Sequence, residues 1–521
     1  MAKRNGKTKL KQTTERRISA VLRLAFVAAL FLGNLALVFL LSYYLQYHVA
    51  LLFMLLQIVG IAVAIHIQGT RGSPSYKMAW TLTVLAVPVA GLILYILWGG
   101  NRQRSRLELN PTPPPAHKDY ERSRSVSYMD KLAESFPTWR RSACYLHNHD
   151  FLVYKDTNVT YFPDGDSFFS DIIRRMEQAE HFIFLEYFIL AEGKLWDRMF
   201  AVLKDRAARG VEVKIIFDDF GNIRRMTGEM LSAIQKCGIE VKAFNPVHQY
   251  VNRLYFNYRD HRKICCIDGD ISYTGGINIA DEYANIIKRF GHWKDSGVSL
   301  EGEGAWGLTR LFLHMWECLD GELQNEYDYY RPHGPVRSEG WCQCFGDGPL
   351  NNPENPAEET YLQAITSARD FVYITTPYLA IEEAMVQALC MAGDSGVDVR
   401  LFLPGIPDHK YTYLAAGAYF DRLLSHGVRI YEYIPGFLHS KMLVADGEMA
   451  ITGTVNMDYR SFQLHYECGV VLYGMSAVEH ILRDIAHVRE QCREILLPRW
   501  RRRNVLRRLA ESLLRLFSIW M

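Results

Sequence analysis

The stretch HRKICCIDGDISYTGGIN, from His261 to Asn278, occurs a second time as HSKMLVADGEMAITGTVN, from His439 to Asn456. The two copies align over 18 positions without a gap, and seven of these positions are identical. Each copy keeps a His, a Lys two residues later, an Asp-Gly pair and a closing Asn. This repetition indicates that the chain contains two copies of one folding unit.

The repeated unit extends well beyond the two quoted stretches. In both copies an apolar strand is followed by a helix-like segment that ends in Gly, then by two further strands and the quoted motif. Alternating strands and helices predict an α/β unit, here duplicated. The two motifs start 178 residues apart, far beyond the ~20–50 residue period of solenoids, so we expect two homologous α/β domains that face each other. The paired segments are HFIFLEYFIL (His181–Leu190) with FVYITTPYLA (Phe371–Ala380), WDRMFAVLKDRAARG with EEAMVQALCMAGDSG, VEVKIIFDD with VDVRLFLPG, and CGIEVKAFNP with HGVRIYEYIP.

Within each motif, the spacing predicts which side chains lie together. His and Lys are two residues apart on an expected strand, so their side chains leave the same face. The Asp-Gly pair falls between two apolar runs, where it favours a tight hairpin turn. The returning strand then places Asn278 or Asn456 near the start of the motif. The small Gly275, Gly276 and Gly453 suit a backbone that approaches an anion closely.

Three uncharged apolar segments open the chain, Leu24–Ser42, Val49–Ile67 and Trp80–Trp98. Each would span about 28 Å as a helix, close to the thickness of the hydrocarbon core of a bilayer. A cleaved signal peptide would account for the first segment alone. We therefore expect N-terminal transmembrane helices to precede the two domains, in a multi-pass protein of the cell membrane.

The distribution of charge bears on the orientation of these helices. The net charge is only +2, yet the first 23 residues hold eight Lys or Arg and one Glu. This basic N-terminus and Arg102, Arg104 and Arg106 all favour the cytoplasmic side. Three full spans do not satisfy both preferences, so two or three spans remain open. We expect the catalytic part at the cytoplasmic face.

The C-terminal tail RWRRRNVLRRLAESLLRLFSIWM is basic and has a helical apolar pattern. This pattern predicts an amphipathic helix that lies on an anionic bilayer. A helix that packs on the protein's own core is an equal alternative. The apolar positions are Val505, Leu506, Leu509, Leu513, Leu516 and Trp520, and Arg507, Arg508 and Arg515 lie elsewhere on the turn.

Two copies of His, Lys and Asn meeting at an interface would form a cationic pocket suited to a phosphodiester. Lysines and asparagines would hold the non-bridging oxygens, while one imidazole attacks phosphorus and the other protonates the departing alcohol. A lone HxK is common by chance, and a single His of this kind is more often structural; the duplication favours the functional interpretation. No metal or cofactor is required by this chemistry, and the ten cysteines show no metal-ligand spacing.

HxKxxxxD followed by GGxN or GTxN, present twice, resembles the phospholipase D superfamily. The flanking LEYF, FDDFGN, PGFLHSK and NMDYRSF are similar to bacterial cardiolipin synthases, and the resemblance covers nearly the whole chain. It implies two phospholipase D-like α/β domains. The implied boundaries are a membrane-spanning region over 1–100, a Pro-rich linker over 101–140, the two domains over 141–335 and 336–498, and a basic amphipathic helix over 499–521.

The resemblance also implies roles for individual residues. His261 would be the nucleophile and His439 the general acid and base, although the near-symmetry allows the reverse. Aligned WKDSGV and HYECGV imply that Asp295 and Glu467 each orient the imidazole of their own half. The family often has Ser after the motif Gly, where this chain has Gly276 and Thr454, which puts a hydroxyl contact in the first half in doubt. The implied catalytic set is His261, Lys263, Asp268, His439, Lys441 and Asp446, and the phosphate-binding or orienting set is Asn278, Asn456, Asp295, Glu467, Thr454 and, more weakly, Glu186.

The implied reaction makes cardiolipin and glycerol from two phosphatidylglycerol molecules through a phosphohistidine. Anionic phospholipids and the membrane are the expected partners, with no nucleic acid and no cofactor. A membrane-bound phospholipase D that hydrolyses or exchanges head groups would carry the same motif. A nucleic-acid enzyme using the basic ends and a scaffold with an inactive site are further alternatives, which the apolar segments and the completeness of both motifs disfavour.

Overall fold

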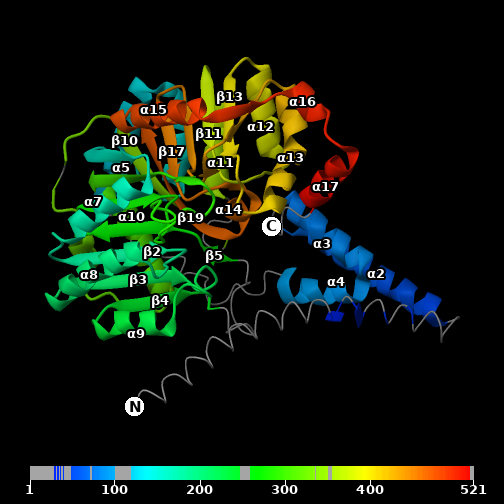
Figure 1. Cartoon of the computed structure of the whole chain (residues 1–521), viewed down its shortest axis with the longest axis horizontal. Coiled ribbons are helices and arrows are strands. Elements are labelled where there is room, and N and C mark those ends of the chain that lie inside the picture. The colour runs from blue at the N-terminus through cyan, green and yellow to red at the C-terminus, as the bar shows by residue number, and fades with distance from the viewer. Residues whose placement is uncertain are drawn as a thin grey trace, which may run out of the picture. The chain divides into compact units, whose positions relative to one another are not determined.

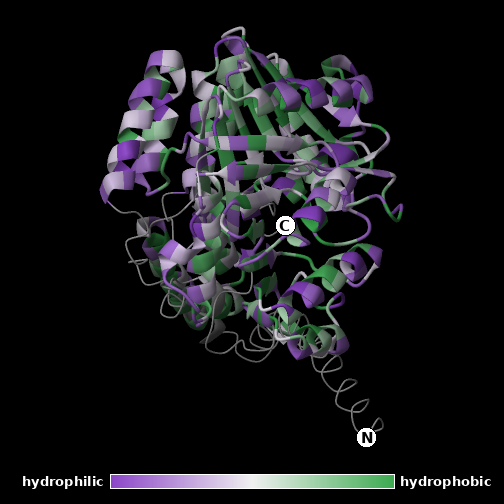
Figure 2. Ribbon diagram, turned by 90° about the vertical axis from the view of Figure 1, so that its left-hand side faces the viewer, coloured by the Kyte–Doolittle hydropathy of each residue, from purple (hydrophilic) through white to green (hydrophobic). Residues whose placement is uncertain are grey.

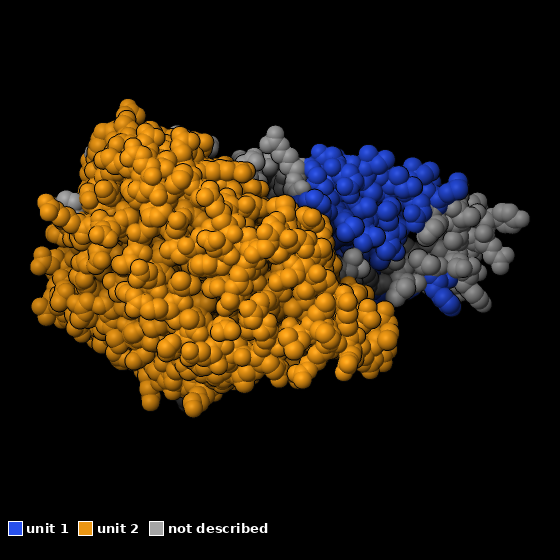
Figure 3. Space-filling model, turned by 90° about the horizontal axis from the view of Figure 1, so that it is seen from above, with its two compact units in different colours: residues 1–106, 246–256 blue, residues 107–245, 257–521 orange. Residues whose placement is uncertain are grey.

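The computed structural model (Figure 1) describes residues 48–70, 73–99, 119–246, 258–334, 336–349 and 355–516, and a few positions between 29 and 39. The chain divides into two compact units, which Figure 3 distinguishes by colour. The smaller unit comprises Met1–Arg106 with Pro246–Phe256, and the larger one comprises Leu107–Asn245 with Asn257–Met521.

The described part of the smaller unit is helical. Ser73 caps α3, because its hydroxyl accepts a hydrogen bond from the amide of Tyr76 at 3.4 Å and Pro74 starts the helix. Gln68 of α2 donates a hydrogen bond to Thr81 of α3 at 3.0 Å, across the turn that joins the two helices. The elements are α2 (His48–Gly69), α3 (Pro74–Ala86), α4 (Pro88–Leu94) and the π-helical turn η1 (Tyr95–Gly99).

The structure describes two of the three apolar segments that were expected to form membrane helices. Val49–Ile67 lies within α2, but Trp80–Trp98 is broken between α3 and α4. Pro88 has no amide hydrogen and disfavours a helical residue before it, and Val87 accordingly has φ −133° and ψ 72°. Most of Leu24–Ser42 lies outside the described residues. Within the part that the structure describes, no helix has both the length and the apolar character needed to cross a membrane.

The larger unit contains two sheets with the same strand order. The first sheet runs β1-β9-β7-β6-β2-β3-β4 and the second β10-β19-β17-β16-β11-β13-β14-β20. In both sheets a central strand has one parallel and one antiparallel neighbour. β2 pairs in parallel with β3 and antiparallel with β6, and β11 pairs in parallel with β13 and antiparallel with β16. The predicted duplicated α/β fold is therefore confirmed.

The first sheet and its helices span residues 157–318. Its core is formed by apolar residues of β2, β3, α7 and α8, such as Ile172, Leu185, Met199 and Ile215, each fully buried. The strands are β1 (Thr157–Phe162), β2 (Phe182–Tyr187), β3 (Glu212–Asp218), β4 (Glu240–Phe244), β6 (Lys263–Ile267), β7 (Ile271–Gly275) and β9 (Gly297–Gly302), and the helices are α7 (Gly165–Met176), α8 (Lys194–Ala208), α9 (Gly228–Lys236) and α10 (Ala305–Cys318).

The second sheet repeats this plan over residues 341–495 and adds β20 at its edge. Figure 2 shows hydrophobic residues concentrated in the strands, while the outer helices carry hydrophilic stretches. The strands are β10 (Trp341–Asp347), β11 (Phe371–Thr375), β13 (Asp398–Pro404), β14 (Arg429–Tyr433), β16 (Met442–Ala445), β17 (Met449–Gly453), β19 (His465–Tyr473) and β20 (Cys492–Ile495), and the helices are α11 (Pro356–Ser367), α12 (Glu383–Asp394), α13 (Lys410–Ser425), α14 (Tyr459–Gln463), α15 (Ser476–Glu490), α16 (Leu497–Arg501) and α17 (Val505–Leu516).

Two short parallel pairings join the halves. β5 (Arg259–Asp260) of the first half pairs with β19, and β15 (Gly436–Leu438) of the second half pairs with β8 (His292–Lys294). Figure 1 shows β5 and β19 between the upper and lower parts of the larger unit. Phe437 of β15 is fully buried in the core of the first half, so the second half contributes to that core.

The predicted linker over 101–140 is shorter than expected, because Asp119–Ser135 forms helix α5. The buried residues Glu121, Ser125, Met129 and Leu132 recur every three or four positions, which is the spacing of one helix face. The 3₁₀ turn η3 (Pro137–Trp139) and α6 (Arg140–Asn148) follow directly. Polar residues dominate α5, so its single buried stripe did not stand out in the sequence.

Candidate functional site

Each motif histidine directly follows one of the short strands that cross between the halves. In the first crossing, Asp260 pairs with Tyr466 and the His261 amide donates to the Tyr466 carbonyl at 2.9 Å. The next residue on β19 is Glu467. In the second, Leu438 pairs with Lys294 and the His439 amide donates to the Lys294 carbonyl at 2.7 Å. The parallel register thus places each histidine beside an acid of the opposite half.

The hydrogen bonds follow this register. His261 Nδ1 lies 2.9 Å from Glu467 Oε1, and His439 Nδ1 lies 2.6 Å from Asp295 Oδ2. The expectation that each acid orients the imidazole of its own half is wrong: the acids are exchanged. The physical reason is that β5 and β15 leave their own sheets and pair with strands of the other half.

Burial and the two lysines lower the pKa of both imidazoles, which favours their neutral form. Burial lowers the pKa of His261 well below its usual value, and the charges of Lys263 and Lys441 lower it further. Burial and Lys441 together lower the pKa of His439 to about 4, against the opposing effect of Asp295. Nδ1 of each ring is thus directed at a carboxylate, and Nε2 of His439 lies 3.0 Å from Lys441 Nζ.

The lysines lie directly against the histidines and are themselves buried. Lys441 Nζ lies 2.8 Å from His439 Nδ1 and 3.0 Å from Nε2, and Lys263 Nζ donates to the main-chain oxygen of His261 at 2.5 Å. Burial lowers the pKa of Lys441 to about 7 and that of Lys263 to about 8. Burial raises the pKa of Asp295, but His439 and Lys441 outweigh it and the net shift is downward.

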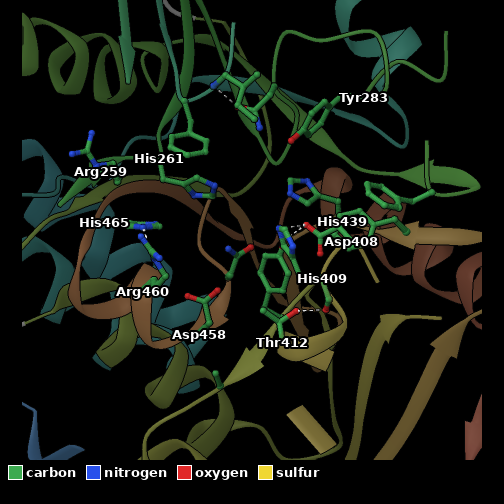
Figure 4. A pocket seen from close by; sticks show the side chains of 18 of the residues that line it. Arg259, His261, Tyr283, Asp408, His409, Thr412, His439, Asp458, Arg460 and His465 are labelled. Carbon is green, nitrogen blue, oxygen red and sulfur yellow. Dashed lines mark hydrogen bonds and ion pairs between the residues drawn. The ribbon is translucent and has the colours of Figure 1, made fainter. Parts of the chain in front are cut away.

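The two histidines and the two motif asparagines line one cavity of about 590 Å³. Figure 4 shows His261 and His439 on opposite sides of it, both directed inward. Asn278 Oδ1 accepts a hydrogen bond from the Ile189 amide at 3.0 Å, which orients its side chain. Asn456 Oδ1 is buried and has no hydrogen-bond partner among the described residues, as expected of a group that awaits a ligand.

Thr454 and Gly276 occupy equivalent positions in the two motifs, but they contact Glu467 and Asp295 in different ways. The Thr454 hydroxyl donates to Glu467 Oε2, while the Cys468 amide donates to the same hydroxyl at 3.0 Å. Thr454 therefore orients Glu467 rather than a ligand. At Gly276 a Cβ atom would overlap Asp295 Oδ1, so the first half has no room for the hydroxyl that its counterpart carries.

The motif aspartates Asp268 and Asp446, like the motif lysines, are not among the residues that line the cavity, and their catalytic role stays a prediction. Each sits in the predicted hairpin turn, with φ of 53°. Asp268 accepts hydrogen bonds at 2.8 Å from the amides of Glu180, His181 and Phe182. Asp446 binds three equivalent amides at the start of β11, at 2.9–3.0 Å. Both carboxylates therefore tie the hairpin to the central strand.

Glu186 is also outside the cavity. It is fully buried in β2, 3.8 Å from the guanidinium of Arg262. Burial and the neighbouring Asp260 raise its pKa well above the usual value. Glu186 thus belongs to a buried polar cluster behind the motif strand, and its weaker place in the phosphate-binding or orienting set stays a prediction.

Several residues of the cavity were not anticipated from the sequence. Trp293 and His465 both stand two positions before the acid of their strand and so share its face. Their ring centroids lie 5.3 Å from His439 and 5.4 Å from His261, respectively. The alignment of WKDSGV with HYECGV contained this signal. The remaining cavity wall includes Phe188, Tyr283, Phe290, Tyr378, Phe437, Arg225, Arg259, Arg289 and Arg460.

Within the described residues, His261, His465 and Glu467 form a group that could hold a metal ion, with ligand atoms within 4.8 Å of one another. Imidazole and carboxylate are suitable ligands for zinc. Glu467, however, already accepts hydrogen bonds from His261 and Thr454, and Arg460 donates to His465 Nε2 at 3.2 Å. These contacts engage Glu467 and His465 Nε2 without an ion, whereas the buried His465 Nδ1 has no hydrogen-bond partner among the described residues. The predicted metal independence remains a prediction.

The arrangement combines an anion-binding pocket with two facing imidazoles. One neutral Nε2 can act as a nucleophile, and the second can exchange a proton with a leaving or entering alcohol. The carboxylate behind each ring stabilises the positive charge that develops on it. Such a site is suited to transfer of a phosphoryl-centred group.

Comparisons with known proteins agree with this geometry. Residues 172–286 and 361–489 match the family described as "Cardiolipin synthase, PLD-like domain", and residues 52–100 match "Phospholipase_D-nuclease N-terminal". The chain is 38% identical to an uncharacterized protein of Streptococcus mutans over 423 residues, which are 80% of this chain and 90% of that one.

A second relative is named by its function. The chain is 33% identical to a cardiolipin synthase of Geobacillus kaustophilus over 465 residues, covering 88% of this chain and 91% of the relative. The phosphatidylserine synthase of Haemophilus influenzae has a similar fold, with a TM-score of 0.55 and 13% identity over 72% of this chain and 97% of that one. The extent of these matches shows that the chain belongs to the cardiolipin synthase family of phospholipase D-like enzymes.

Proposed function

We propose that this enzyme is a membrane phosphatidyltransferase that makes cardiolipin and glycerol from two molecules of phosphatidylglycerol. One observation carries the proposal: two imidazoles, each held by an acid of the opposite half, face a single cavity beside two buried lysines. This pairing supplies one nucleophile and one proton-transfer group for a phosphodiester, and membership of the cardiolipin synthase family supports the lipid substrate.

In the first step, Nε2 of His261 attacks the phosphorus of one phosphatidylglycerol. A P–N bond forms as the P–O bond to the head-group glycerol breaks, and His439 gives its proton to the departing oxygen. The bound phosphodiester offsets the charge of Lys263 and Lys441, which raises the pKa of His439 from its low value in the free enzyme. The same lysines, with the motif asparagines, stabilise the non-bridging oxygens.

In the second step, the glycerol hydroxyl of another phosphatidylglycerol gives its proton to His439 Nε2 and attacks phosphorus. The P–N bond breaks, cardiolipin leaves, and both imidazoles return to their starting state. One phosphodiester replaces another, so the reaction consumes no nucleotide. We assign the nucleophile to His261 from the family resemblance, and the near-symmetry of the two halves allows the reverse.

The C-terminal helix α17 supports a membrane location. It packs on α13 through its polar side, where the buried Glu511 is bound by Arg503 at 2.7 Å and Arg507 at 3.0 Å. Four of its apolar side chains are 59–73% exposed, whereas Leu514 is only partly exposed. A helix that packs on a core would bury such a face. We propose that this face, formed by Val505, Leu506, Leu509 and Leu513, lies on an anionic bilayer.

The N-terminal region supports the same location. In α2 the side chains of Met54, Ile58 and Ile65 are 57–69% exposed. The arginines after Trp98 favour a cytoplasmic catalytic part. Placing the cavity at the membrane face would favour a lipid alcohol over water as the acceptor.

The test uses membranes that contain the full-length protein, phosphatidylglycerol labelled in its head group, and a chelator. Cardiolipin and free labelled glycerol are expected, and both should be lost with His261→Ala. Phosphatidic acid without cardiolipin would instead identify a hydrolytic phospholipase D. No turnover of any lipid would refute the proposal.

A further inference from the structure

We propose that Arg225 and Arg289, joined through Glu282, bind the phosphate group of the acceptor phospholipid on the His439 side of the cavity. This inference rests on the proposed function and deepens it. A transferase that joins two anionic lipids must hold two phosphates at once. The donor phosphate lies between the two imidazoles, so the acceptor phosphate needs a second cationic site one glycerol unit away.

The three residues form a compact cluster on the cavity wall. Arg225 Nη1 lies 3.3 Å from Glu282 Oε1, and Arg289 Nη1 lies 3.1 Å from the same oxygen. All three residues line the cavity. One carboxylate thus holds two guanidinium groups at one place, and the cluster keeps a net charge of one positive unit. A guanidinium has five N–H donors, which suit phosphate oxygens.

The cluster is on the side of the cavity where the acceptor alcohol must enter. Tyr283 follows Glu282 in the chain, and its ring centroid lies 5.4 Å from that of His439. Tyr283 and Arg225 line the same cavity. His439 is the group that takes the proton from the acceptor hydroxyl. The glycerol of the acceptor would therefore lie beside Tyr283, with its phosphate at the arginine pair.

The other two arginines of the wall are engaged differently. Arg259 is 1% exposed, and its Nη1 donates to the Asn245 carbonyl at 3.1 Å and lies 3.5 Å from Asp218. Arg460 donates through Nε to His465, on the His261 side. Arg225 and Arg289 have 26% and 51% of their side chains exposed, whereas Arg259 as a whole is 1% exposed. Accessible positive charge on the His439 side therefore comes from this pair.

The test compares two acceptors in the same reconstituted full-length protein. Phosphatidylglycerol as acceptor gives cardiolipin, whereas isotopically labelled free glycerol as acceptor gives labelled phosphatidylglycerol by head-group exchange. Both reactions use the same donor step, and only the first has an acceptor phosphate. In the double variant Arg225→Gln/Arg289→Gln, we expect the ratio of cardiolipin formation to exchange to fall about tenfold, the effect of losing one charge-assisted contact. Raising the membrane fraction of phosphatidylglycerol should partly restore it.

Two matched variants sharpen the result. Arg225→Lys/Arg289→Lys keeps the charge and should preserve most of the ratio, and Arg209→Gln, an exposed arginine paired with Asp205, should leave the ratio unchanged. An equal fall of both reactions would overturn the inference, because the pair would then be structural. An unchanged ratio would overturn it as well. If the unmodified protein catalyses neither reaction, the proposed function fails instead.

Discussion

The imidazole of His261 is hydrogen-bonded through Nδ1 to Glu467, an acid 206 residues away in the other half of the chain. The reciprocal bond joins His439 to Asp295 over 144 residues. Neither half therefore contains a complete catalytic pair, and the site exists only where the halves meet. Duplication of the motif supplies two incomplete sets, and the exchange of β5 and β15 completes both.

Because the acids are exchanged, a variant of each acid should resemble the variant of the histidine to which that acid is hydrogen-bonded, in the other half of the chain. We expect Glu467→Gln to slow attack by His261 by roughly 10²–10⁴-fold, because Nδ1 loses the carboxylate that fixes its proton. The measurement is pre-steady-state release of p-nitrophenol from phosphatidyl-p-nitrophenol, a leaving group that needs no protonation. The burst should be lost in Glu467→Gln and retained in Asp295→Asn.

The Asp295→Asn variant serves as the reciprocal control. It should form the phosphatidyl-enzyme in the burst and then stall, because His439 cannot activate the acceptor. His439→Ala should behave in the same way, and His261→Ala should match Glu467→Gln. If each acid variant instead matched the histidine of its own half, the exchanged assignment would be rejected.

Asp268 and Asp446 should affect stability rather than chemistry. Replacing Asp268 by Ala leaves three amides at the start of β2 without their carboxylate, and we expect the free energy of unfolding to fall by roughly 2–3 kcal/mol. Denaturant unfolding measures this change, and turnover per folded molecule should stay within about threefold of the unmodified enzyme. A large loss of turnover with unchanged stability would support a catalytic role for Asp268 instead.

The repeat made the two sheets predictable from the sequence, but the way in which the two halves join was not predictable from it. The local apolar runs and the Asp-Gly turns of each motif specify β6, β7, β16 and β17, and the conserved order of segments specifies their neighbours. β5, β8 and β15 are two or three residues long, so they have no periodicity to recognise. Their pairing depends on how the two sheets meet.

The same limit applies to the site residues. His261, His439, the two motif lysines and the two asparagines were identified because their types and spacing recur. The motif aspartates recur equally well, yet each binds three main-chain amides, and repetition alone does not separate a structural role from a catalytic one. Arg225 and Arg289 lie outside the segments that align between the two copies, so comparison of the copies could not reveal them.

Lys441 should control the protonation of His439. Burial and the charge of Lys441 lower the pKa of His439 to about 4. Removing the charge in Lys441→Met should raise this pKa by about one pH unit or more, so that more His439 is protonated at a given pH. Nuclear magnetic resonance of ¹⁵N-histidine-labelled protein between pH 4 and 8 measures the titration. Lys441→Arg keeps the charge and should leave the pKa low; an unchanged pKa in Lys441→Met would show that burial alone sets it.

The exposed face of α17 should set the affinity of the enzyme for anionic membranes. Leu506→Gln/Leu509→Gln removes two side chains that are 73% and 61% exposed, so it should not disturb the packing of α13. We expect the fraction of anionic lipid needed for half-maximal turnover to rise several-fold, on the order of the loss from two leucines that no longer enter the interface. Met391→Gln, at an exposed apolar position of α12, is the matched control. The same shift in both variants would argue against a specific membrane face.

Gly276 should not tolerate the side chain that its counterpart carries. A Cβ atom at this position would overlap Asp295 Oδ1 and approach the main-chain oxygen of His439 to 3.1 Å. Gly276→Ala should displace Asp295 from His439 Nδ1 and slow turnover by on the order of 10²-fold, as expected for a small displacement of a catalytic group. Steady-state cardiolipin formation measures the effect, with Gly334→Ala as the control, since nothing lies within 4 Å of a Cβ at that glycine.

Thr454→Ser keeps the hydroxyl that binds Glu467, and its turnover should remain within a few-fold of that of the unmodified enzyme. Full activity of Gly276→Ser would show that the first half can accept the serine common in the family, and that Asp295 is held less tightly than its contact with His439 implies.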